Sequence, residues 1–391
     1  MPPSAPRPRA CVVHQSLHDH VGGAASVTAW ALQALSRDFE VVLATPDPIV
    51  DFTNLDETYG TSLSKASVGL QTLAIPEWMR RLPPGQLKSL RLAAAFRRAD
   101  LGQQGPDVVF NTANEMSFDG VSVNYVHCPI RHRRMVRELC RGPGRWLRLA
   151  NNAAFKAVSG FDERSFRRSA CVANSRWTAA ALRRTYGMTA EVIYPPVTRP
   201  PRAPRPLAER SPGFVCIGRV SAEKRTHEAI EVVDELRRDG HDVHLHLVGT
   251  AEGSYARQVE RRVAASPHVW LHRGFSRAQL AELLDEHRFG LHMMRNEHFG
   301  MAVAEMTAAG MLVLGHASAG PAEILGERSP LLFADQREAA AVAARLLRST
   351  ALQEDLLAGL RAEGVADAFA PETFMRSIRR VVGEAIQLGA S

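Results

Sequence analysis

The chain has 391 residues, 45% of them hydrophobic, and a formal net charge of +7. This length predicts two domains rather than one, each with enough apolar residues for a buried core. No apolar run is long enough to span a membrane, and the start, MPPSAPRPRA, lacks the apolar region of a signal peptide. The five cysteines are scattered without a C-x-x-C pair, which is typical of reduced thiols in a cytosolic protein and not of a disulfide or zinc framework.

The first half of the chain predicts a parallel α/β sheet. A strand in RACVVHQSL is followed by a Gly-Gly turn, a helix in GGAASVTAWALQALSRD and a second strand in FEVVLATP. PDVVFNT and VSVNYVHCP add strands, and ACVANSRWTAAALRRTYG predicts a strand, a polar cap, a helix and a glycine stop. The alternation of strands and helices is that of βαβ units.

The excess positive charge is concentrated in residues 131–168, which hold 11 basic and 3 acidic residues, a balance of +8. Trp146, Leu147 and Leu149 are interleaved with these basic residues. Two interpretations stay open. The segment is either a solvated helix face or a surface that attracts anionic lipid or a phosphorylated partner.

A proline-rich segment, IYPPVTRPPRAPRP at residues 193–206, interrupts the pattern and predicts a linker or an interdomain crossing. Strands and helices then alternate again, from GFVCIGR through THEAIEVVDELRRDG and DVHLHLVG to FGLHMM and LVLGH. We therefore predict two facing Rossmann-like domains. Their ligand would bind in a central cleft, beyond the carboxyl ends of the strands.

Two glutamates lie eight positions apart in NEHFGMAVAEMTAAG, with Glu297 in a strand-to-helix loop and Glu305 inside the helix. The amides of residues 298–301 fall at the helix N-terminus, where unpaired N–H groups bind anions and hydroxyls. Eight residues span roughly 12 Å of helix, so both carboxylates can reach one extended ligand. Spacing alone equally allows Glu297 to be a helix cap and Glu305 a solvated position.

A second motif, IGRVSAEKRT, places Arg219 at the end of a strand and Lys224 near the start of the next helix. Two cations beside a helix N-terminus suit a diphosphate. Only 4 of the 48 basic residues are lysines, which makes a lysine at this position more informative. A surface pair on a loop is the alternative.

Strand-GR-x4-K followed by E-x7-E resembles the retaining GT-B glycosyltransferases of family 4. VANSRWTAAALRRTYG, VIYPPV, GFSRAQLAELL and AAGMLVLGHASAGPAEIL are similar to family segments in the same order. GLHMMRNEHFGMAVAEMTAAG and NYVHCP are especially similar to the mannosyltransferases that extend the dolichol-linked oligosaccharide. The resemblance implies an acceptor-side domain at 1–195, a nucleotide-sugar-binding domain at 196–367, and a C-terminal helix at 368–391 that crosses back to the first domain.

The resemblance also implies a role for each site residue. The catalytic set would be Glu297 on the transferred sugar, His127 close to that sugar, and Arg219 with Lys224 on the diphosphate. Glu305 would hold the ribose hydroxyls. The remaining donor contacts would come from the loops around the diphosphate, the base and the sugar, at Gly22, Gly23, Gly274, Phe275, His298, Phe299, Gly300 and Met301.

The implied function is transfer of a hexose, mannose or a related sugar, from a nucleotide-diphosphate sugar to a hydroxyl acceptor with retention of configuration. GDP-mannose is favoured over a UDP-sugar, and the acceptor would be a lipid-linked or small-molecule glycan. We expect no metal and no cofactor, because no D-x-D motif has a suitable setting and a fixed Arg/Lys pair can stabilise the leaving diphosphate.

Other functions stay open. A nucleotide-sugar epimerase or hydrolase, or a non-catalytic nucleotide-sugar-binding subunit, could use the same fold. A nicotinamide enzyme is disfavoured because no G-x-G-x-x-G follows the first strand. We expect a cytoplasmic protein without a nucleic-acid partner, with peripheral contact to the inner face of an anionic membrane as a further possibility.

Overall fold

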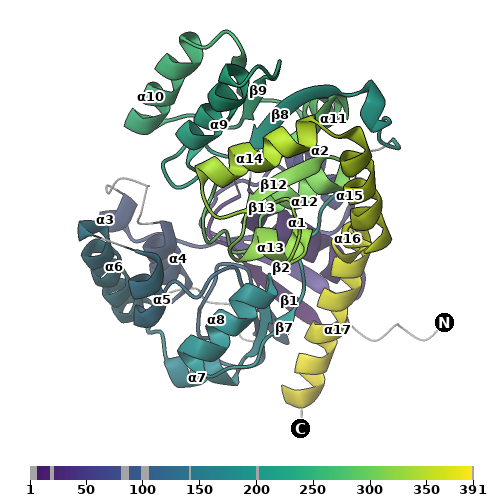
Figure 1. The fold of residues 1–391 in the computed structure, drawn as a ribbon. Helices are drawn as coiled ribbons and strands as arrows, with labels where there is room; N and C mark the ends of the chain where they lie inside the picture. The colour runs from purple at the N-terminus through teal and green to yellow at the C-terminus, as the bar shows by residue number, and fades with distance from the viewer. Residues whose placement is uncertain are drawn as a thin grey trace, which may run out of the picture. The chain divides into compact units, whose positions relative to one another are not determined.

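The computed structural model describes residues 7–17, 22–80, 88–97, 105–140, 142–199 and 202–389; its ribbon is drawn in Figure 1. The chain divides into two compact units, Met1–Pro196 with Pro371–Ser391, and Val197–Ala370. Each unit contains one parallel sheet with helices packed around it. The predicted α/β class with two Rossmann-like domains is therefore confirmed. In the part of the chain that is described, no helix combines the length and apolarity that a membrane crossing needs.

The sheet of the first unit has the strand order β3-β2-β1-β4-β5-β6-β7, with all neighbours parallel. Its strands are β1 (Arg9–Val13), β2 (Glu40–Thr45), β3 (Val68–Thr72), β4 (Val108–Asn111), β5 (Ser122–Val126), β6 (Ala170–Ala173) and β7 (Glu191–Val192). Its helices are α1 (Gly23–Leu35), α2 (Phe52–Tyr59), η1 (Leu63–Lys65), α3 (Glu77–Arg80), α4 (Lys88–Phe96), α5 (Arg133–Leu139), α6 (Pro143–Ser159), α7 (Glu163–Arg168), α8 (Arg176–Tyr186) and α17 (Pro371–Gly389). The central strands β4 and β5 are buried along their whole length, as a sheet covered on both faces requires.

The last helix, α17, packs against the first unit (Figure 1, yellow). Its apolar residues recur at helical spacing, and Phe374 and Ile378 join the same buried cluster as Trp30 of α1. Arg379 of α17 pairs with Asp38 just beyond α1. The C-terminal segment therefore completes the core in which the chain begins.

The sheet of the second unit has the order β10-β9-β8-β11-β12-β13. Its strands are β8 (Ser211–Ile217), β9 (Leu245–Val248), β10 (Val269–His272), β11 (His287–His292), β12 (Leu312–His316) and β13 (Leu332–Phe333). Its helices are η3 (Leu207–Glu209), α9 (Thr226–Arg238), α10 (Gly253–Ala264), α11 (Arg277–Glu286), α12 (Met301–Ala308), α13 (Gly320–Leu325), α14 (Gln336–Leu347), α15 (Thr350–Ala362) and α16 (Val365–Ala368). The chain builds outward from β8 to β10, then returns to the other side of β8 with β11. The switch point of this sheet thus lies between β8 and β11, and ligands of such sheets bind beyond the carboxyl ends at that point.

Local capping signals in the sequence fix several helix ends. The side chain of Ser175 accepts from the amide of Thr178 at the start of α8, and Gly187 ends that helix in a left-handed conformation. Ser276 and Gln279 form a capping box at the start of α11. The strand, cap, helix and glycine stop predicted from ACVANSRWTAAALRRTYG are confirmed.

A buried arginine holds the amino edge of the second sheet together. The side chain of Arg210, directly before β8, is fully buried and lies 3.7 Å from the carboxylate of Asp285. Its guanidinium donates, at 2.9 to 3.5 Å, to the carbonyls of Arg205, Leu284, His287, Ala309 and Gly310. Several of these carbonyls lie at the ends of α11 and α12, where the helix cannot satisfy them and where a cation is favoured.

We expect Arg210→Met to destabilise the second unit, because it leaves buried carbonyls without donors. Each such group costs ~1–3 kcal/mol, so the free energy of unfolding should fall by at least about 3 kcal/mol. Hydrogen exchange of the β8 and β11 amides measures this loss. Arg238→Met, at an exposed arginine in the last turn of α9, is the matched control and should change stability by less than ~0.5 kcal/mol. Equal protection in both variants would contradict the role of Arg210.

Candidate functional site

The residues predicted to bind a nucleotide sugar come together at the switch point of the second sheet. Arg219 and Lys224 lie in the loop that follows β8, and Glu297 lies in the loop that follows β11. Because β8 and β11 are parallel neighbours, both loops leave the same edge of the sheet. The fold thus brings together motifs that are far apart in the sequence.

Glu297 is the best-held carboxylate of this site. Its Oε2 accepts a hydrogen bond from Nζ of Lys224 at 2.5 Å and lies 3.3 Å from Nε2 of His292, a buried residue at the end of β11. Burial alone would raise the pKa of Glu297, but the nearby His292 ring and the charge of Lys224 outweigh it and hold the pKa far below its usual range. The carboxylate therefore stays ionised and can accept hydrogen bonds from ligand hydroxyls. Sequence reasoning missed His292, whose only signal was its position at a strand end.

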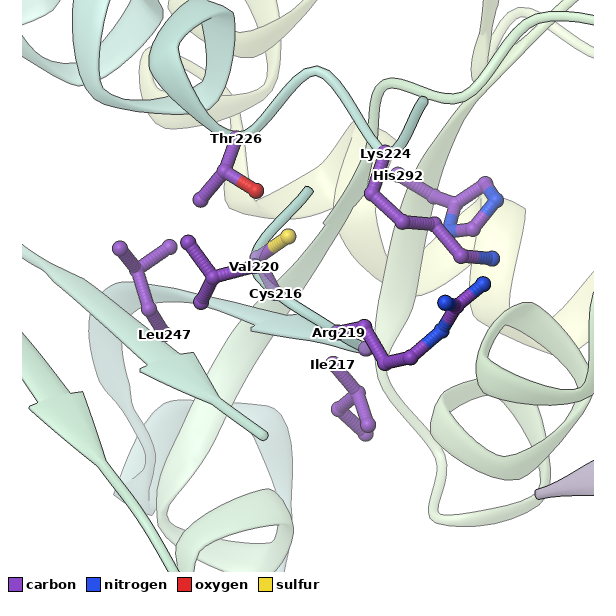
Figure 2. Close-up of a pocket in the computed structure, with 9 residues that line it drawn as sticks. Cys216, Ile217, Arg219, Val220, Lys224, Thr226, Leu247 and His292 are labelled. Atoms are coloured by element: carbon purple, nitrogen blue, oxygen red, sulfur yellow. The ribbon is translucent and has the colours of Figure 1, made fainter. Parts of the chain in front are cut away.

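Arg219 adds a second cation to the same place. Figure 2 shows the side chains of Arg219, Lys224 and His292 turned towards one another beside a small pocket. The pocket is also lined by Cys216, Ile217, Gly218, Val220, Thr226 and Leu247. The side chain of Arg219 is 69% exposed, and its contact with Glu223 is long, at 3.7 Å. An exposed pair of this kind is weak, so the guanidinium is available to an anionic ligand.

The loop that carries Arg219 is fixed by direct backbone contact. The amide of Gly218 donates to the carbonyl of Val248 at 2.9 Å. A Cβ atom on Gly249 would lie only 2.1 Å from the carbonyl oxygen of Gly218. The loops after β8 and β9 can approach this closely only because residue 249 has no side chain.

The backbone after Glu297 enters α12 through Gly300, which has a φ of +101°. Among the described residues, the amides of Gly300 and Met301 have no acceptor, as expected for a first helical turn. The carbonyl of Glu297 accepts from the amide of Gly320 at 2.8 Å, and the amide of Asn296 donates to Ser318 at 2.8 Å. The loop after β12 thus holds these donors in place.

Of the two residues between Glu297 and Gly300, Phe299 is buried and His298 is half-buried. Phe299 packs edge-on against Phe369, with ring centroids 5.3 Å apart. Burial lowers the pKa of His298, although the nearby charge of Glu297 opposes the shift. His298 is therefore neutral at physiological pH, and its ring adds no further cation to the site.

Glu305 differs from Glu297 in having no fixed partner. In the part of the chain that is described, its carboxylate makes no hydrogen bond and no ion pair. Burial raises its pKa to about 7, and the charge of Arg277 opposes this shift only in part. The residue keeps some exposed surface. Such a carboxyl is available to the hydroxyl groups of a ligand.

The residues predicted to border the nucleobase lie after β10. Gly274 is exposed with a φ of +65°, and the ring of Phe275 contacts that of His272 with centroids 4.6 Å apart. They precede the capping box of α11. These residues leave the same edge of the sheet as Lys224, two strands away from β8.

The predicted residues of the first unit follow strands of its own sheet. Gly22 and Gly23 begin α1, and the amide of Gly22 donates to the hydroxyl of Tyr59 at 3.2 Å. His127 directly follows β5, and its Nε2 lies 3.2 Å from the carbonyl oxygen of Thr112. Since a carbonyl only accepts, Nε2 carries the proton in this contact.

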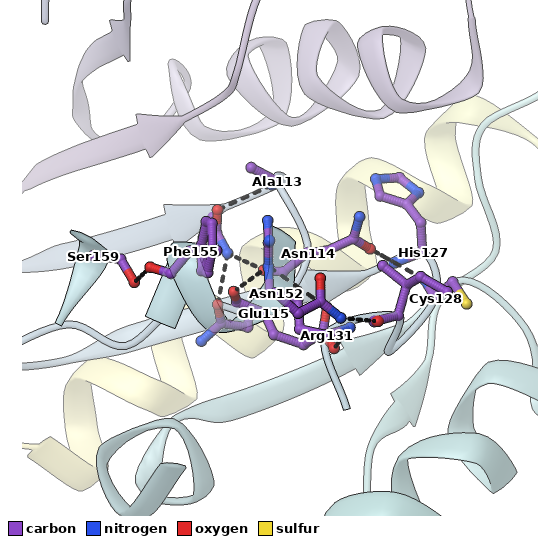
Figure 3. A network of polar contacts seen from close by, with 12 residues as sticks. Ala113, Asn114, Glu115, His127, Cys128, Arg131, Asn152, Phe155 and Ser159 are labelled. Carbon is purple, nitrogen blue, oxygen red and sulfur yellow. Dashed lines mark hydrogen bonds and ion pairs between the residues drawn. The ribbon is translucent and has the colours of Figure 1, made fainter. Parts of the chain in front are cut away.

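A buried network positions the His127 loop (Figure 3). Oδ1 of Asn114 accepts from the amides of His127 at 2.8 Å and Cys128 at 3.1 Å. Next to it, Oε1 of Glu115 accepts from the amide of Arg131 at 2.9 Å. The loop after β4 therefore sets the course of the chain after β5.

The interpretation of residues 131–168 as one charged surface is wrong for its first member. Arg131 is 6% exposed, and its guanidinium lies 3.3 Å from the ring centroid of Phe155. Burial lowers the pKa of Arg131 to about 10, against the attraction of Glu115. By contrast, Trp146 and Leu147 of α6 are 65% and 58% exposed. Arg141 lies outside the described residues.

Comparison with known proteins places the second unit in a family. Residues 200–358 match the model of glycosyl transferases group 1. The chain is 30% identical over 166 residues to a GDP-Man:Man(3)GlcNAc(2)-PP-Dol alpha-1,2-mannosyltransferase of Mus musculus, covering 38% of this chain and 34% of the relative. It is 28% identical over 221 residues to the protein of that name from Eremothecium gossypii, covering 51% of this chain and 38% of that relative. The chain thus spans only 34% to 38% of the length of these two relatives.

Solved structures share the whole architecture at low identity. Sucrose-phosphate synthase from Thermosynechococcus elongatus has a TM-score of 0.72 at 17% identity, over 98% of this chain and 100% of its own. WaaG, a glycosyltransferase involved in lipopolysaccharide biosynthesis, has a TM-score of 0.69 at 16% identity, over 95% and 99%. HepE from Anabaena, in complex with UDP and glucose, has a TM-score of 0.65 at 16% identity, over 96% of this chain and 99% of its own. The chain thus has the GT-B fold of these proteins, and its residues 200–358 form a glycosyl transferase group 1 domain.

Proposed function

We propose that the protein is a glycosyltransferase that moves mannose from GDP-mannose to a hydroxyl of a lipid-linked glycan, without a metal and with retention of configuration. The observation that carries this proposal is the arrangement of Lys224, His292 and ionised Glu297 at the switch point of a glycosyl transferase group 1 domain. GDP-mannose is favoured because both relatives described above are mannosyltransferases named for GDP-Man. A UDP-sugar and a small soluble acceptor are the alternatives that the experiments below would reveal.

Two cations would bind the diphosphate of the donor. Breaking the sugar–phosphate bond builds negative charge on the leaving group, and preorganised donors stabilise that charge most strongly where water is excluded. Lys224 is paired with Glu297. The diphosphate would therefore share the Lys224 ammonium with this carboxylate and gain the exposed guanidinium of Arg219.

Glu297 would bind the transferred sugar. As an ionised carboxylate it accepts hydrogen bonds from sugar hydroxyls, and the amides of Gly300 and Met301 can donate to sugar oxygens. Glu305 would accept from the ribose hydroxyls of the nucleotide. Retention would follow from attack of the acceptor on the face that the diphosphate leaves, with a phosphate oxygen taking the proton of the acceptor hydroxyl.

The acceptor side is proposed from the surface of the first unit. Trp146 and Leu147 protrude from α6, beside the exposed Arg148. Aromatic and aliphatic side chains next to arginines are suited to the interface of an anionic membrane. We propose that the protein is cytoplasmic and contacts the inner membrane face peripherally, where a lipid-linked glycan would be presented; the exposed α6 side chains support this contact.

The ribose role of Glu305 predicts a pH dependence of donor binding. Hydroxyl donors favour its carboxylate form, and its pKa in the free protein is about 7, so binding below that pH must release a proton. Calorimetric affinity for GDP-mannose should rise between about pH 6 and pH 8 and then level off. Glu305→Gln should abolish this rise and weaken binding by about 1–3 kcal/mol.

Glu297→Gln is the matched control for that measurement. Because Glu297 is ionised throughout this range, its variant should keep the rise in nucleotide affinity and lose turnover instead. The ribose role is wrong if Glu305→Gln binds GDP-mannose with the parent's affinity and pH profile.

Removing Lys224 should reduce turnover more than binding. Lys224→Ala is expected to lower the transfer rate on the order of 100-fold, the scale for loss of one preorganised charge-stabilising donor. Lys65→Ala, at an exposed lysine of η1, should leave the rate unchanged. EDTA should not affect the parent rate. Loss of transfer on chelation, with recovery on addition of Mg²⁺, would overturn the metal-free mechanism.

The membrane contact predicts salt-sensitive binding to anionic vesicles through α6. The Trp146→Ser, Leu147→Ser double variant should lose co-sedimentation with phosphatidylserine vesicles, because both exposed apolar anchors are gone. Leu388→Ser is the matched control, since Leu388 is equally apolar and 79% exposed on α17. Parent protein that stays in solution at low salt, and is fully active on a soluble acceptor, would rule the contact out.

A further inference from the structure

Four histidines gather in the sheet of the second unit, and one of them, His272, also contacts Phe275 of the candidate donor site. His244 precedes β9 and His246 lies within it, so the two side chains point to the same face of the sheet. His287 begins β11, and His272 ends β10. Glu297 follows the opposite end of β11, so His287 and Glu297 are separated by the length of that strand.

Three of these histidines can direct one ring nitrogen each to a common point. The ligand atoms of His244, His246 and His287 all lie within 4.8 Å of one another. Nε2 of His244 lies 3.0 Å from Nε2 of His287. The rings of His246 and His287 meet with centroids 4.6 Å apart.

Hydrogen bonds orient two of the three rings. Nδ1 of His287 lies 2.7 Å from the carbonyl oxygen of Leu283, and since a carbonyl only accepts, Nδ1 carries the proton. Nε2 of a neutral His287 ring is therefore unprotonated, and its lone pair can bind a metal ion. Nδ1 of His246 lies 2.8 Å from Nε2 of His272. Contacts of this kind, made by the non-ligating nitrogen, orient metal-binding histidines.

A histidine binds a metal ion through an unprotonated ring nitrogen, so the ring must be neutral. Burial lowers the pKa of each of the four imidazoles, and that of His246 to about 3. Of the charged groups beside the cluster, Glu286 lies next to His287, and Asp242 next to His244 is paired with Arg237 at 3.0 Å.

The geometry is close to that of a tetrahedral ion. Two nitrogens bound to Zn²⁺ at about 2.0–2.1 Å lie roughly 3.3–3.4 Å apart. That spacing falls between the 3.0 Å separation of the two Nε2 atoms and the 4.8 Å limit of the cluster. Gly213 of β8 makes room for the His244 ring, since a Cβ atom there would lie 2.2 Å from its Nε2.

We propose that His244, His246 and His287 bind a structural zinc ion, with the fourth position open to water. On binding, the ion replaces the contact between the two Nε2 atoms, and the His244 proton moves from Nε2 to Nδ1. The ion links β9 to the junction of α11 and β11, and it takes no part in glycosyl transfer.

The test uses the full chain after treatment with a chelator and its removal. Titration with Zn²⁺ should give one equivalent bound and raise the thermal midpoint, because a ligand that binds only the folded state stabilises it. Co²⁺ should give the ligand-field bands of a tetrahedral site without a thiolate charge-transfer band, since the ligands are nitrogens. None of these measurements uses transferase activity, so this proposal and the proposed function fail separately.

Two variants locate the ion. His244→Ala should weaken Zn²⁺ binding at least about 100-fold, beyond the loss typical of outer-shell changes. Gly213→Ala, which pushes against the His244 ring without removing a ligand, should weaken binding as well. His227→Ala should bind as the parent does, since the His227 ring contacts Tyr255 and lies outside the cluster. Zn²⁺ affinity unchanged in His244→Ala, absence of binding at micromolar Zn²⁺, or a thiolate band with Co²⁺ would each overturn the site.

Discussion

The ion pair between Lys224 and Glu297 ties together the two loops that form the candidate donor site. It crosses the switch point, because Lys224 follows β8 and Glu297 follows β11. Partly buried pairs contribute little net stability, since the loss of hydration offsets the attraction between the charges. The pair is best understood as a positioning device: His292 and Lys224 approach the same carboxylate oxygen and leave the other for a ligand.

The two glutamates of the site show how environment divides roles between identical side chains. Both are half-buried, yet the pKa of Glu297 is lowered and that of Glu305 is raised to about 7. The difference comes from partners: a histidine and a lysine contact the first, and neither a hydrogen bond nor an ion pair reaches the second in the described part of the chain. Titratable groups whose pKa values are pushed apart in this way commonly mark functional sites.

Sequence reasoning succeeded where the signal was local and failed where it was tertiary. Ser175 and Gly187 mark the ends of α8 by their own chemistry, and the alternating strands and helices predict two parallel sheets. The edge strand β3 was missed because it is mostly exposed and has no apolar run. Composition counted Arg131 as surface charge, whereas packing on Phe155 buries it. The histidine cluster comes from strands whose neighbours are known only once the sheet is formed.

The contact between Gly218 and Gly249 fixes the backbone of two loops but leaves the neighbouring side chains free to vary. The carbonyl of Gly218 occupies the space that any side chain at position 249 would need. The side chain of Arg219, which is 69% exposed, is not held by this contact. The spacing of the loops after β8 and β9 is set by main-chain atoms, which every amino acid shares. Divergence of this domain is therefore expected to change its side chains while the path of its backbone is inherited unchanged.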